Sequence, residues 1–252
     1  MNAQPLAGKV AVVTGGSRGL GLAITHGLSR AGATVAVASR KLAGCEAVVA
    51  ELTAGGARAS AHAFDAGRWE DCDRLHAEVT AQWGGAQILI NNVGMSPVAA
   101  SSLDTSEALF NKIIAVNLRA PFRLSALFGT QMRAARGGAI VNISSSGSLR
   151  PQPVFAPYAA AKAGVNVLTQ TFAKELGPSV RVNTVMPGPF HTEATKAWSR
   201  SDQFSQHARS TMPLGRAGEP DEIVEAVLYL VGDGASFTTG ACLTVDGGHS
   251  IA

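Results

Sequence analysis

The chain has 252 residues, 46% of them hydrophobic and only 15% charged, with a formal net charge of +3. A chain of this length can bury a substantial core in one domain, and its mild charge, spread over scattered basic residues, does not indicate nucleic-acid binding. No apolar run reaches the ~18 residues that a membrane span requires, and the first eight residues lack the charged and apolar regions of a signal peptide.

Cysteine usage indicates the compartment. Cys45, Cys72 and Cys242 are odd in number and far apart, and no Cys-x-x-Cys or His-x-x-His spacing exists among them and the six histidines. We therefore predict reduced thiols, a cytoplasmic protein and no bound metal.

The first strand-like run, residues 9–13, leads into a glycine-rich turn, Thr14-Gly-Gly-Ser-Arg-Gly-Leu-Gly21, and then into a helical pattern that extends to about residue 31. Glycine lets the backbone approach a phosphate closely, and the N-terminus of a helix favours negative charge. The spacing differs from the general Gly-x-Gly-x-x-Gly fingerprint, and an ordinary tight turn would also fit. The position between the first strand and the first helix favours phosphate binding.

A second strand, residues 34–39, ends in Ser39-Arg40-Lys41. In a dinucleotide-binding fold this strand end faces the adenosine ribose, where an acidic residue accepts from the 2′-hydroxyl and an arginine accommodates a 2′-phosphate. Arg40 has no acidic neighbour, and Arg18 of the glycine turn points to the same region. We therefore predict NADP(H) in preference to NAD(H). The alternative is that Arg40 and Lys41 merely begin a solvated helix.

Strands and helices continue to alternate after this point. We expect strands at 58–64 and 87–90, and helices at 42–54, 68–83 and 106–134. The fourth strand ends in Asn91-Asn-Val-Gly94, whose small and amide groups suit an adenine or ribose pocket but also suit a turn. Asn117 lies in the interior of the long helix, where asparagine is mildly unfavourable, and this hints at a specific role.

The apolar run 139–143, bounded by glycines and serines, predicts a buried strand. The helix that begins near Pro157 carries Tyr158 and Lys162 four residues apart, on one face. A nearby ammonium would lower the pKa of the phenol from about 10, so that Tyr158 could exchange a proton with a substrate oxygen. A serine at the end of the strand would lie at the same sheet edge. Taken alone, a tyrosine four residues before a lysine would also fit an ordinary surface pair. The glycine-rich turn near the N-terminus is a second, independent signal, and it favours a catalytic role for this pair.

The last third of the chain predicts a strand at 180–185, a helix at 220–231 and a final strand at 243–245. Between them, residues 188–212 are polar with scattered aromatics (Phe190, Trp198 and Phe204), which indicates a mobile cover over a site, some of whose aromatics pack it against the body. The alternation runs unbroken over residues 1–252, so we predict one doubly wound α/β domain with a mostly parallel sheet.

Taken together, these motifs resemble the short-chain dehydrogenase/reductase family of the ~250-residue type, over nearly the whole length. The family's Thr-Gly-x-x-x-Gly-x-Gly matches residues 14–21, and its Asn-Asn-Ala-Gly matches residues 91–94 with Val93 in place of alanine. Its Tyr-x-x-x-Lys matches Tyr158 and Lys162, and its serine thirteen residues before the tyrosine selects Ser145 from the run 144–146. Each motif is of moderate specificity, but the ordered set is strong.

The resemblance implies a seven-stranded Rossmann-like sheet and hydride transfer between NADP(H) and a carbonyl or secondary alcohol. Tyr158 would give a proton to the carbonyl oxygen as hydride reaches its carbon, with the reverse steps in oxidation. Ser145 would orient the substrate oxygen, and Lys162 would also bind the nicotinamide ribose. Asn117, which matches the family's helical asparagine, would hold a water that links Lys162 to solvent.

The family pattern also implies the cofactor contacts. Asp65 matches the acidic residue near adenine, and Thr192 matches the threonine at the nicotinamide carboxamide. The full predicted set is Gly15, Ser17, Arg18, Gly19, Leu20, Gly21, Ser39, Arg40, Asp65, Ala66, Asn92, Val93, Gly94, Tyr158, Lys162, Pro187, Gly188 and Thr192. A homotetramer, or a dimer, with the C-terminal segment 240–252 at one contact, is expected by the same resemblance.

The substrate stays open at this level. Arg150 and His191 are the charged or titratable candidates near the expected pocket, and Arg150 would either bind an acidic group or be a solvated loop residue. A 3-oxoacyl thioester, a steroid, a sugar and a small ketone are all compatible. Two other functions are considered: a cofactor-binding sensor or scaffold of the same fold without catalysis, and an epimerase or dehydratase of nucleotide sugars, whose members are usually longer.

Overall fold

The computed structural model describes residues 4–251. Parts of two sequence-based expectations lie outside the described residues. They are residues 1–3 of the N-terminal segment in which no signal peptide is expected, and residue 252 of the expected C-terminal contact segment. Within the described part of the chain, no helix combines the length and the apolar character needed to cross a membrane.

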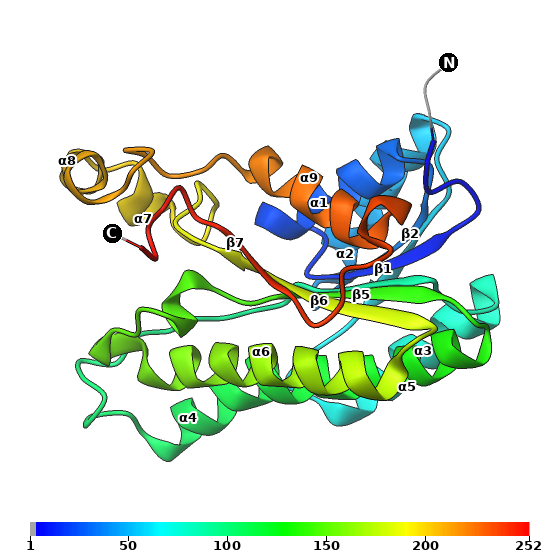
Figure 1. Cartoon of the computed structure of the whole chain (residues 1–252), viewed down its shortest axis with the longest axis horizontal. Coiled ribbons are helices and arrows are strands. Elements are labelled where there is room, and N and C mark those ends of the chain that lie inside the picture. Colours follow the sequence, from blue (N-terminus) through cyan, green and yellow to red (C-terminus); the bar gives the residue numbers. More distant parts are fainter. Residues whose placement is uncertain (1–3, 252) are drawn as a thin grey trace.

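Seven parallel strands form a single sheet in the order β3-β2-β1-β4-β5-β6-β7 (Figure 1). The order reverses between β1 and β4, so the connections that follow these two strands leave in opposite directions and open a crevice at their carboxyl ends. The strands are β1 (Val10–Thr14), β2 (Thr34–Ser39), β3 (Ala59–Ala63), β4 (Ile88–Asn91), β5 (Gly138–Ile143), β6 (Val180–Pro187) and β7 (Cys242–Val245). The predicted Rossmann-like, seven-stranded α/β fold is confirmed.

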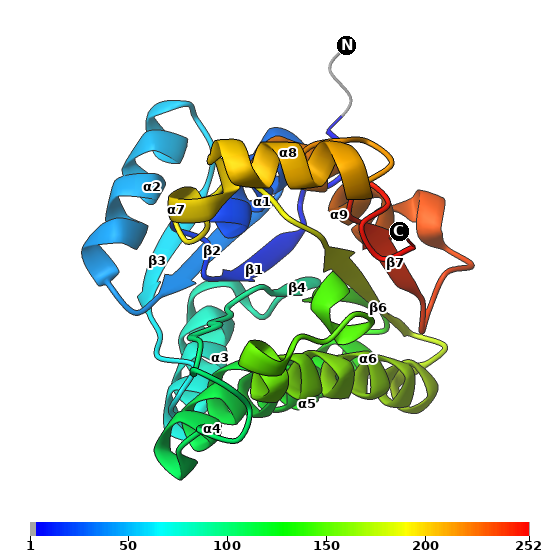
Figure 2. The same cartoon turned by 90° about the vertical axis from the view of Figure 1, so that its left-hand side faces the viewer.

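Helices cover both faces of the sheet (Figure 2). One face is covered by α1 (Gly19–Arg30), α2 (Leu42–Ala54) and α9 (Val224–Val231), and the other by α3 (Trp69–Trp83), α4 (Glu107–Ile114), α5 (Ala120–Ala134) and α6 (Ala156–Leu176). Each face has its own hydrophobic core: Ala11 and Val13 of β1 belong to one, and Val10 and Val12 to the other. Burial on both faces explains why the strands read as continuous apolar runs.

The polar cover contains two helices that its composition did not predict. They are α7 (Lys196–Ser199) and α8 (Asp202–Thr211), and the hydroxyl of Ser201 caps α8 by accepting from the Phe204 amide. Trp198 and Phe204 pack on each other edge to face, with ring centroids 5.1 Å apart, whereas Phe190 is buried against the body beside Gly218. Two of the three aromatic side chains therefore pack within the cover, and the third packs the cover against the body of the protein.

Two other predicted helices differ in detail. The helix predicted at 106–134 is interrupted by a π turn, η1 (Ala115–Arg119), which contains Asn117, and the helix predicted at 220–231 begins with a 3-10 turn, η4 (Pro220–Ile223). Local periodicity does not reveal one extra residue in a helical turn, so the sequence pattern could not predict the π turn. Further 3-10 turns are η2 (Ser146–Ser148), η3 (Pro153–Phe155) and η5 (Asp233–Ala235).

A buried chain of polar side chains fixes the strand ends beneath the crevice. Asn91 Nδ2 donates to Asn142 Oδ1 over 2.8 Å, and Asn142 Nδ2 donates to Thr169 Oγ1 over 2.8 Å. The hydroxyls of Thr169 and Thr184 lie 2.7 Å apart. These bonds link β4, β5 and β6 to α6, and β4 and β5 are the strands that lead to Asn92 and Ser145.

We predict that Asn142→Ala lowers the free energy of unfolding by about 2–4 kcal/mol, because it removes two buried hydrogen bonds and leaves a small void. Urea denaturation measures the change. Thr171→Ala is the control, since this exposed hydroxyl of α6 bonds the Val167 carbonyl of its own helix and its loss should change stability by no more than about 0.5 kcal/mol. Equal losses in the two variants would contradict a structural role for this chain.

Candidate active site

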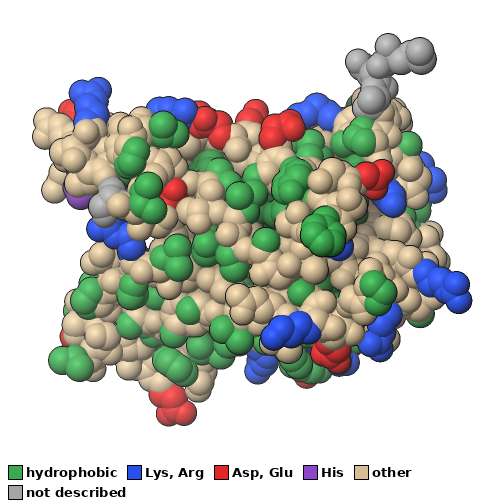
Figure 3. Space-filling view, viewed as in Figure 1, with side chains coloured by type: hydrophobic (Ala, Val, Ile, Leu, Met, Phe, Trp, Pro, Cys, Tyr) green, Lys and Arg blue, Asp and Glu red, His purple; other side chains and the backbone are tan. Residues whose placement is uncertain are grey.

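A cavity of about 580 Å³ opens at the carboxyl ends of the strands, between the sheet and the cover. Figure 3 shows the notch between the α7–α8 segment and the rest of the molecule, on the left of the view. Most of the predicted site residues line it, although they come from positions spread over the whole chain: Gly15, Arg18, Gly19, Leu20, Gly21, Ser39, Arg40, Asp65, Ala66, Asn92, Val93, Gly94, Ser145, Tyr158, Lys162, Pro187, Gly188 and Thr192.

Ser17 and Asn117 do not line this cavity. The Ser17 side chain lies against the start of α2, within hydrogen-bonding reach of the Cys45 thiol. The Ser17 hydroxyl is thus directed to the buried Cys45 thiol, and its contact with the cofactor stays a prediction.

The glycine turn is shaped as a phosphate cradle. Gly15 and Gly19 have φ angles of 66° and 55°, and a Cβ on Gly21 would lie 2.2 Å from the Gly15 carbonyl oxygen. Asn92 Nδ2 donates to the Thr14 carbonyl over 2.9 Å and closes the turn from the side of β4. Arg18, the residue before α1, makes no side-chain cap, and residues 19–21 of the first turn of α1 line the cavity. A dinucleotide pyrophosphate fits this arrangement.

Ser145, Tyr158 and Lys162 meet at the other end of the cavity. The Ser145 hydroxyl accepts from the Gly147 amide over 3.0 Å and is hydrogen-bonded to Tyr158. Lys162 Nζ donates to the carbonyl of Ile143 over 2.8 Å and lies 5.8 Å from the centroid of the Tyr158 ring. The end of β5 and the first turns of α6 thus bring the three side chains to one point.

Burial controls the protonation of this group. It raises the pKa of Tyr158 above 10.0, although the hydrogen bond from Ser145 acts in the opposite direction, and it lowers the pKa of Lys162 to about 8. The expectation that Lys162 lowers the Tyr158 pKa is therefore not met in this structure. Desolvation of the phenol raises its pKa, and the Lys162 ammonium is directed to the Ile143 carbonyl instead.

Asn117 is fully buried and does not line the cavity, and its side chain forms hydrogen bonds with Met95 in the loop after β4. Its Oδ1 accepts from the Met95 amide over 3.1 Å, and its Nδ2 donates to the carbonyls of Met95 and Ile113, each over 2.9 Å. A Cβ on Gly94 would lie 3.2 Å from Asn117 Oδ1 and 3.4 Å from Lys162 Nζ. Asn117 therefore positions the wall beside Lys162.

Arg150 and His191 are engaged outside the cavity. Arg150 Nη1 donates to the His249 carbonyl over 2.7 Å and so anchors the C-terminal segment. His191 Nδ1 lies 3.1 Å from the buried Ser199 hydroxyl, and its Nε2 lies 3.9 Å from a Glu219 carboxylate oxygen. Both side chains connect the cover or the tail to the body and neither lines this cavity, and a role of either in substrate binding stays a prediction.

Several lining residues were not predicted. Phe64 and Arg68 flank Asp65, and Lys112 and Val116 come from the helix that leads to Asn117. Phe64 and Arg68 lie next to the predicted end of the third strand, so their position at a strand end was a signal that the sequence did contain. The last two depend on how α4 packs across the crevice, for which the sequence holds no local signal. Among residues 4–251, no cluster of three or more His, Cys, Asp or Glu side chains is arranged to hold a metal ion.

A parallel sheet with a strand-order reversal, a glycine cradle at that point and a polar group at the same edge define a Rossmann-like dinucleotide-binding protein. A family model described as enoyl-(acyl carrier protein) reductase matches residues 15–250. Human dehydrogenase/reductase SDR family member 4 is 34% identical over 246 residues, which cover 97% of this chain and 88% of that protein.

Solved structures agree. A gluconate 5-dehydrogenase from Burkholderia cenocepacia, in complex with NADP and tartrate, is 30% identical with a TM-score of 0.94 over 100% of this chain and 98% of the other. A blue fluorescent protein from a metagenomic library, in complex with NADPH, is 31% identical with a TM-score of 0.91 over 97% of this chain and 99% of the other. The chain belongs to the short-chain dehydrogenase/reductase family.

The lowered pKa of Lys162 predicts a distinctive pH dependence of stability. As pH rises through about 8, Lys162 loses its proton in the folded state, while in the unfolded chain it stays protonated up to 10.5. The unfolded chain then binds more protons, so stability rises with pH over this window. Relative to Lys162→Met, the wild type should gain about 2 kcal/mol between pH 7 and 9.5.

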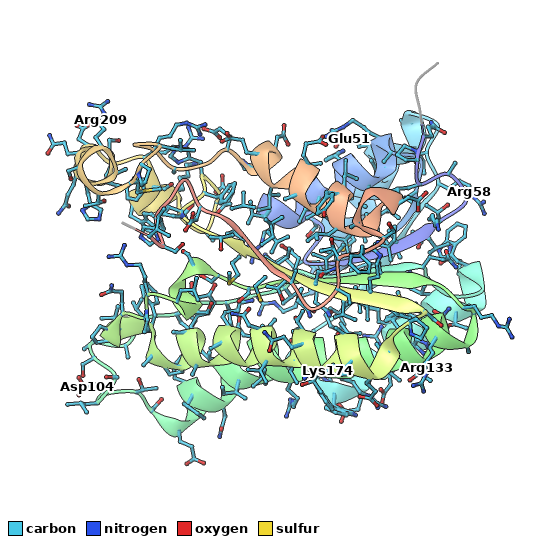
Figure 4. All side chains as sticks on the ribbon, viewed as in Figure 1. Glu51, Arg58, Asp104, Arg133, Lys174 and Arg209 are labelled. Carbon is cyan, nitrogen blue, oxygen red and sulfur yellow. The ribbon has the colours of Figure 1, made fainter. Side chains whose placement is uncertain are left out.

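Urea denaturation of both proteins at the two pH values provides the measurement. Lys174→Met is the matched control, because Lys174 is an exposed lysine near the end of the same helix (Figure 4). The difference between wild type and this control should not change with pH. A wild type that gained nothing over Lys162→Met would contradict the assigned burial of the ammonium.

Proposed function

We propose that this protein is an NADP(H)-dependent oxidoreductase that interconverts a carbonyl compound and a secondary alcohol, with Tyr158 as the general acid and base. The observation that carries the proposal is the meeting of Ser145, Tyr158 and Lys162 at one end of a cavity whose other end is a phosphate cradle. A bound nicotinamide would supply or accept the hydride. The residues of the chain then have to orient the substrate oxygen and move one proton.

The protonation states support this division of work. Desolvation raises the pKa of Tyr158, so its hydroxyl is protonated at neutral pH and can donate to a carbonyl oxygen. The Ser145 hydroxyl, hydrogen-bonded to Tyr158, can hold the same oxygen. The pKa of Lys162 is about 8, so its amine can carry or release a proton near neutral pH. A group of this kind beside the phenol can support proton transfer at Tyr158. We further propose that Asn117 acts through the Met95 segment that it clasps.

Two arginines support the choice of NADP(H). Arg18 and Arg40 both line the cavity at the end of β2, where the adenosine ribose would lie. Guanidinium groups suit a 2′-phosphate, and two similar structures contain NADP or NADPH. We propose that these arginines hold the 2′-phosphate.

The substrate and the assembly are proposed more broadly. Similarity to a gluconate 5-dehydrogenase makes sugar acids and their keto forms the first compounds to screen, together with 3-oxoacyl thioesters, steroids and small ketones. Exposed apolar side chains on the outer helices and near the C-terminus (Phe110, Phe122, Val167, Phe237 and Ile251) support a homotetramer or dimer. The odd cysteine count supports a cytoplasmic, reducing compartment.

We predict that Tyr158→Phe lowers turnover of the best substrate from the screen by about 10²–10⁴-fold, because the proton donor is lost. NADPH affinity should change little, since the ring is retained. Tyr229→Phe, the change at the one other tyrosine in the chain, is the control, because its exposed hydroxyl lies 3.0 Å from Thr238. Near-normal turnover by Tyr158→Phe would refute the assignment.

We predict that Arg40→Ala weakens NADPH binding by about 10–100-fold and leaves NADH binding unchanged, because it removes a charge-assisted contact to the 2′-phosphate. Titration of each variant with the two nucleotides, followed by nicotinamide fluorescence, measures this. Arg30→Ala, at the far end of α1, is the control. Equal losses for NADPH and NADH would place Arg40 away from the 2′ position, and failure of the wild type to bind either nucleotide would favour the inert scaffold.

A further inference from the structure

The loop after β3 forms one wall of the cavity through Asp65, Ala66, Gly67 and Arg68, and we call residues 65–68 the β3 loop. Its own bonds give it a tight shape. Gly67 N donates to Asp65 Oδ1 over 2.9 Å, Arg68 N donates to the Asp65 carbonyl over 3.0 Å, and Asp65 N donates to Asp71 Oδ2 over 2.8 Å. All of these contacts lie within seven residues of sequence.

One contact reaches the β3 loop from elsewhere. Arg119 Nη2 donates to the carbonyl oxygen of Gly67 over 2.6 Å, across 52 residues of sequence. A guanidinium that donates to a carbonyl makes a charge-assisted bond, which is stronger than a neutral one. Arg119 itself is exposed and does not line the cavity. Its contact with the site therefore runs through the loop.

Arg119 belongs to the same π turn as Asn117, which also bonds a residue of the cavity lining. Arg119 is the last residue of the π turn η1, which also carries Asn117 and the cavity-lining Val116. Asn117 bonds both the amide and the carbonyl of Met95, which also lines the cavity, so two side chains of one π turn hold two segments of the cavity lining. A π turn displaces the following residues relative to an α-helix, and such turns are frequent at functional sites.

We propose that Arg119 is a positioning residue for the cofactor: it holds the β3 loop in the conformation that receives the adenosine half of the nucleotide. This inference rests on the proposed function. Asp65 and Ala66 would contact the adenine, and Arg119 would act on them through the Gly67 carbonyl. Ordering this loop before the ligand arrives reduces the conformational entropy lost on binding, so affinity rises without any direct contact.

A second explanation must be separated by the test, because the charge of Arg119 could also attract nucleotide phosphates through space. Such long-range attraction is screened by salt, whereas an ordered loop is not. It would also act more strongly on a ligand with more phosphates. Fragments that differ by one phosphate therefore distinguish the two explanations.

The experiment measures binding of 5′-AMP and of 2′,5′-ADP by titration calorimetry, so it requires neither a substrate nor turnover. We expect Arg119→Ala to weaken both fragments by the same factor, about three- to tenfold, in low salt and in 0.5 M salt alike. Arg119→Lys, which keeps the positive charge and an N–H donor group, should recover part of the loss. Arg40→Ala should weaken 2′,5′-ADP alone.

Arg133→Ala is the matched control. Arg133 is an exposed arginine near the other end of α5 that donates to the Glu175 carbonyl over 3.4 Å, remote from the cavity (Figure 4). Its loss should leave both affinities unchanged. Thermal denaturation of each variant checks that the fold persists, and Arg119→Gln, which keeps a long polar side chain, replaces the alanine variant if that variant does not fold.

Three results would overturn the inference. If Arg119→Ala bound both fragments as tightly as Arg133→Ala, the loop would not need the contact. If its loss disappeared in high salt, or affected 2′,5′-ADP alone, the charge would be acting through space. If the wild type bound neither fragment, the proposed cofactor site would fail and the inference with it, a result distinct from the other two.

Discussion

The link between Thr14 and Asn92 is the contact on which the site depends. These residues follow or end the two strands at which the strand order reverses, and at that point the sheet's own hydrogen bonds run out. Thr14 Oγ1 accepts from the amides of Asn92 and Val93, and Asn92 Nδ2 donates back to the Thr14 carbonyl. The glycine cradle and the wall beside Lys162 are thereby held together across the crevice. This link therefore adds side-chain bonds where the pairing of β1 with β4 ends.

The reactive end of the cavity shows a compromise between stability and chemistry. A buried lysine and a half-buried tyrosine are costly to ionise, and desolvation displaces their pKa values in opposite directions. The Ile143 carbonyl partly offsets the cost for Lys162. A ligand that brings charge or hydroxyl groups into the cavity would change this balance, so occupancy and protonation are expected to be coupled.

The long helical stretch α4-η1-α5 connects regions that the sheet keeps apart. Its π turn places Asn117 against Met95 and Arg119 against Gly67, two residues from different segments of the cavity lining. In a regular α-helix the side chains of residues 117 and 119 would point in other directions relative to each other. The π turn changes this angle, and both contacts are made at once. Asparagine is mildly unfavourable inside a regular helix, but Asn117 lies in the π turn, where its side chain helps to assemble the site.

Sequence alone determined the strand–helix order, because each element records itself in local periodicity: β2 and α2 have the predicted bounds, and the glycine turn, Ser145, Tyr158 and Lys162 all reach the predicted cavity. Only the tertiary structure decided the contact of Ser17 with the Cys45 thiol, the attachment of Arg150 to the tail, the raised pKa of Tyr158 and the contact of Arg119 with Gly67. The physical reason is that spacing along a chain sets which face or edge a residue occupies. Burial, desolvation and long-range partners depend on what packs against that face, and partners tens of residues apart leave no local pattern.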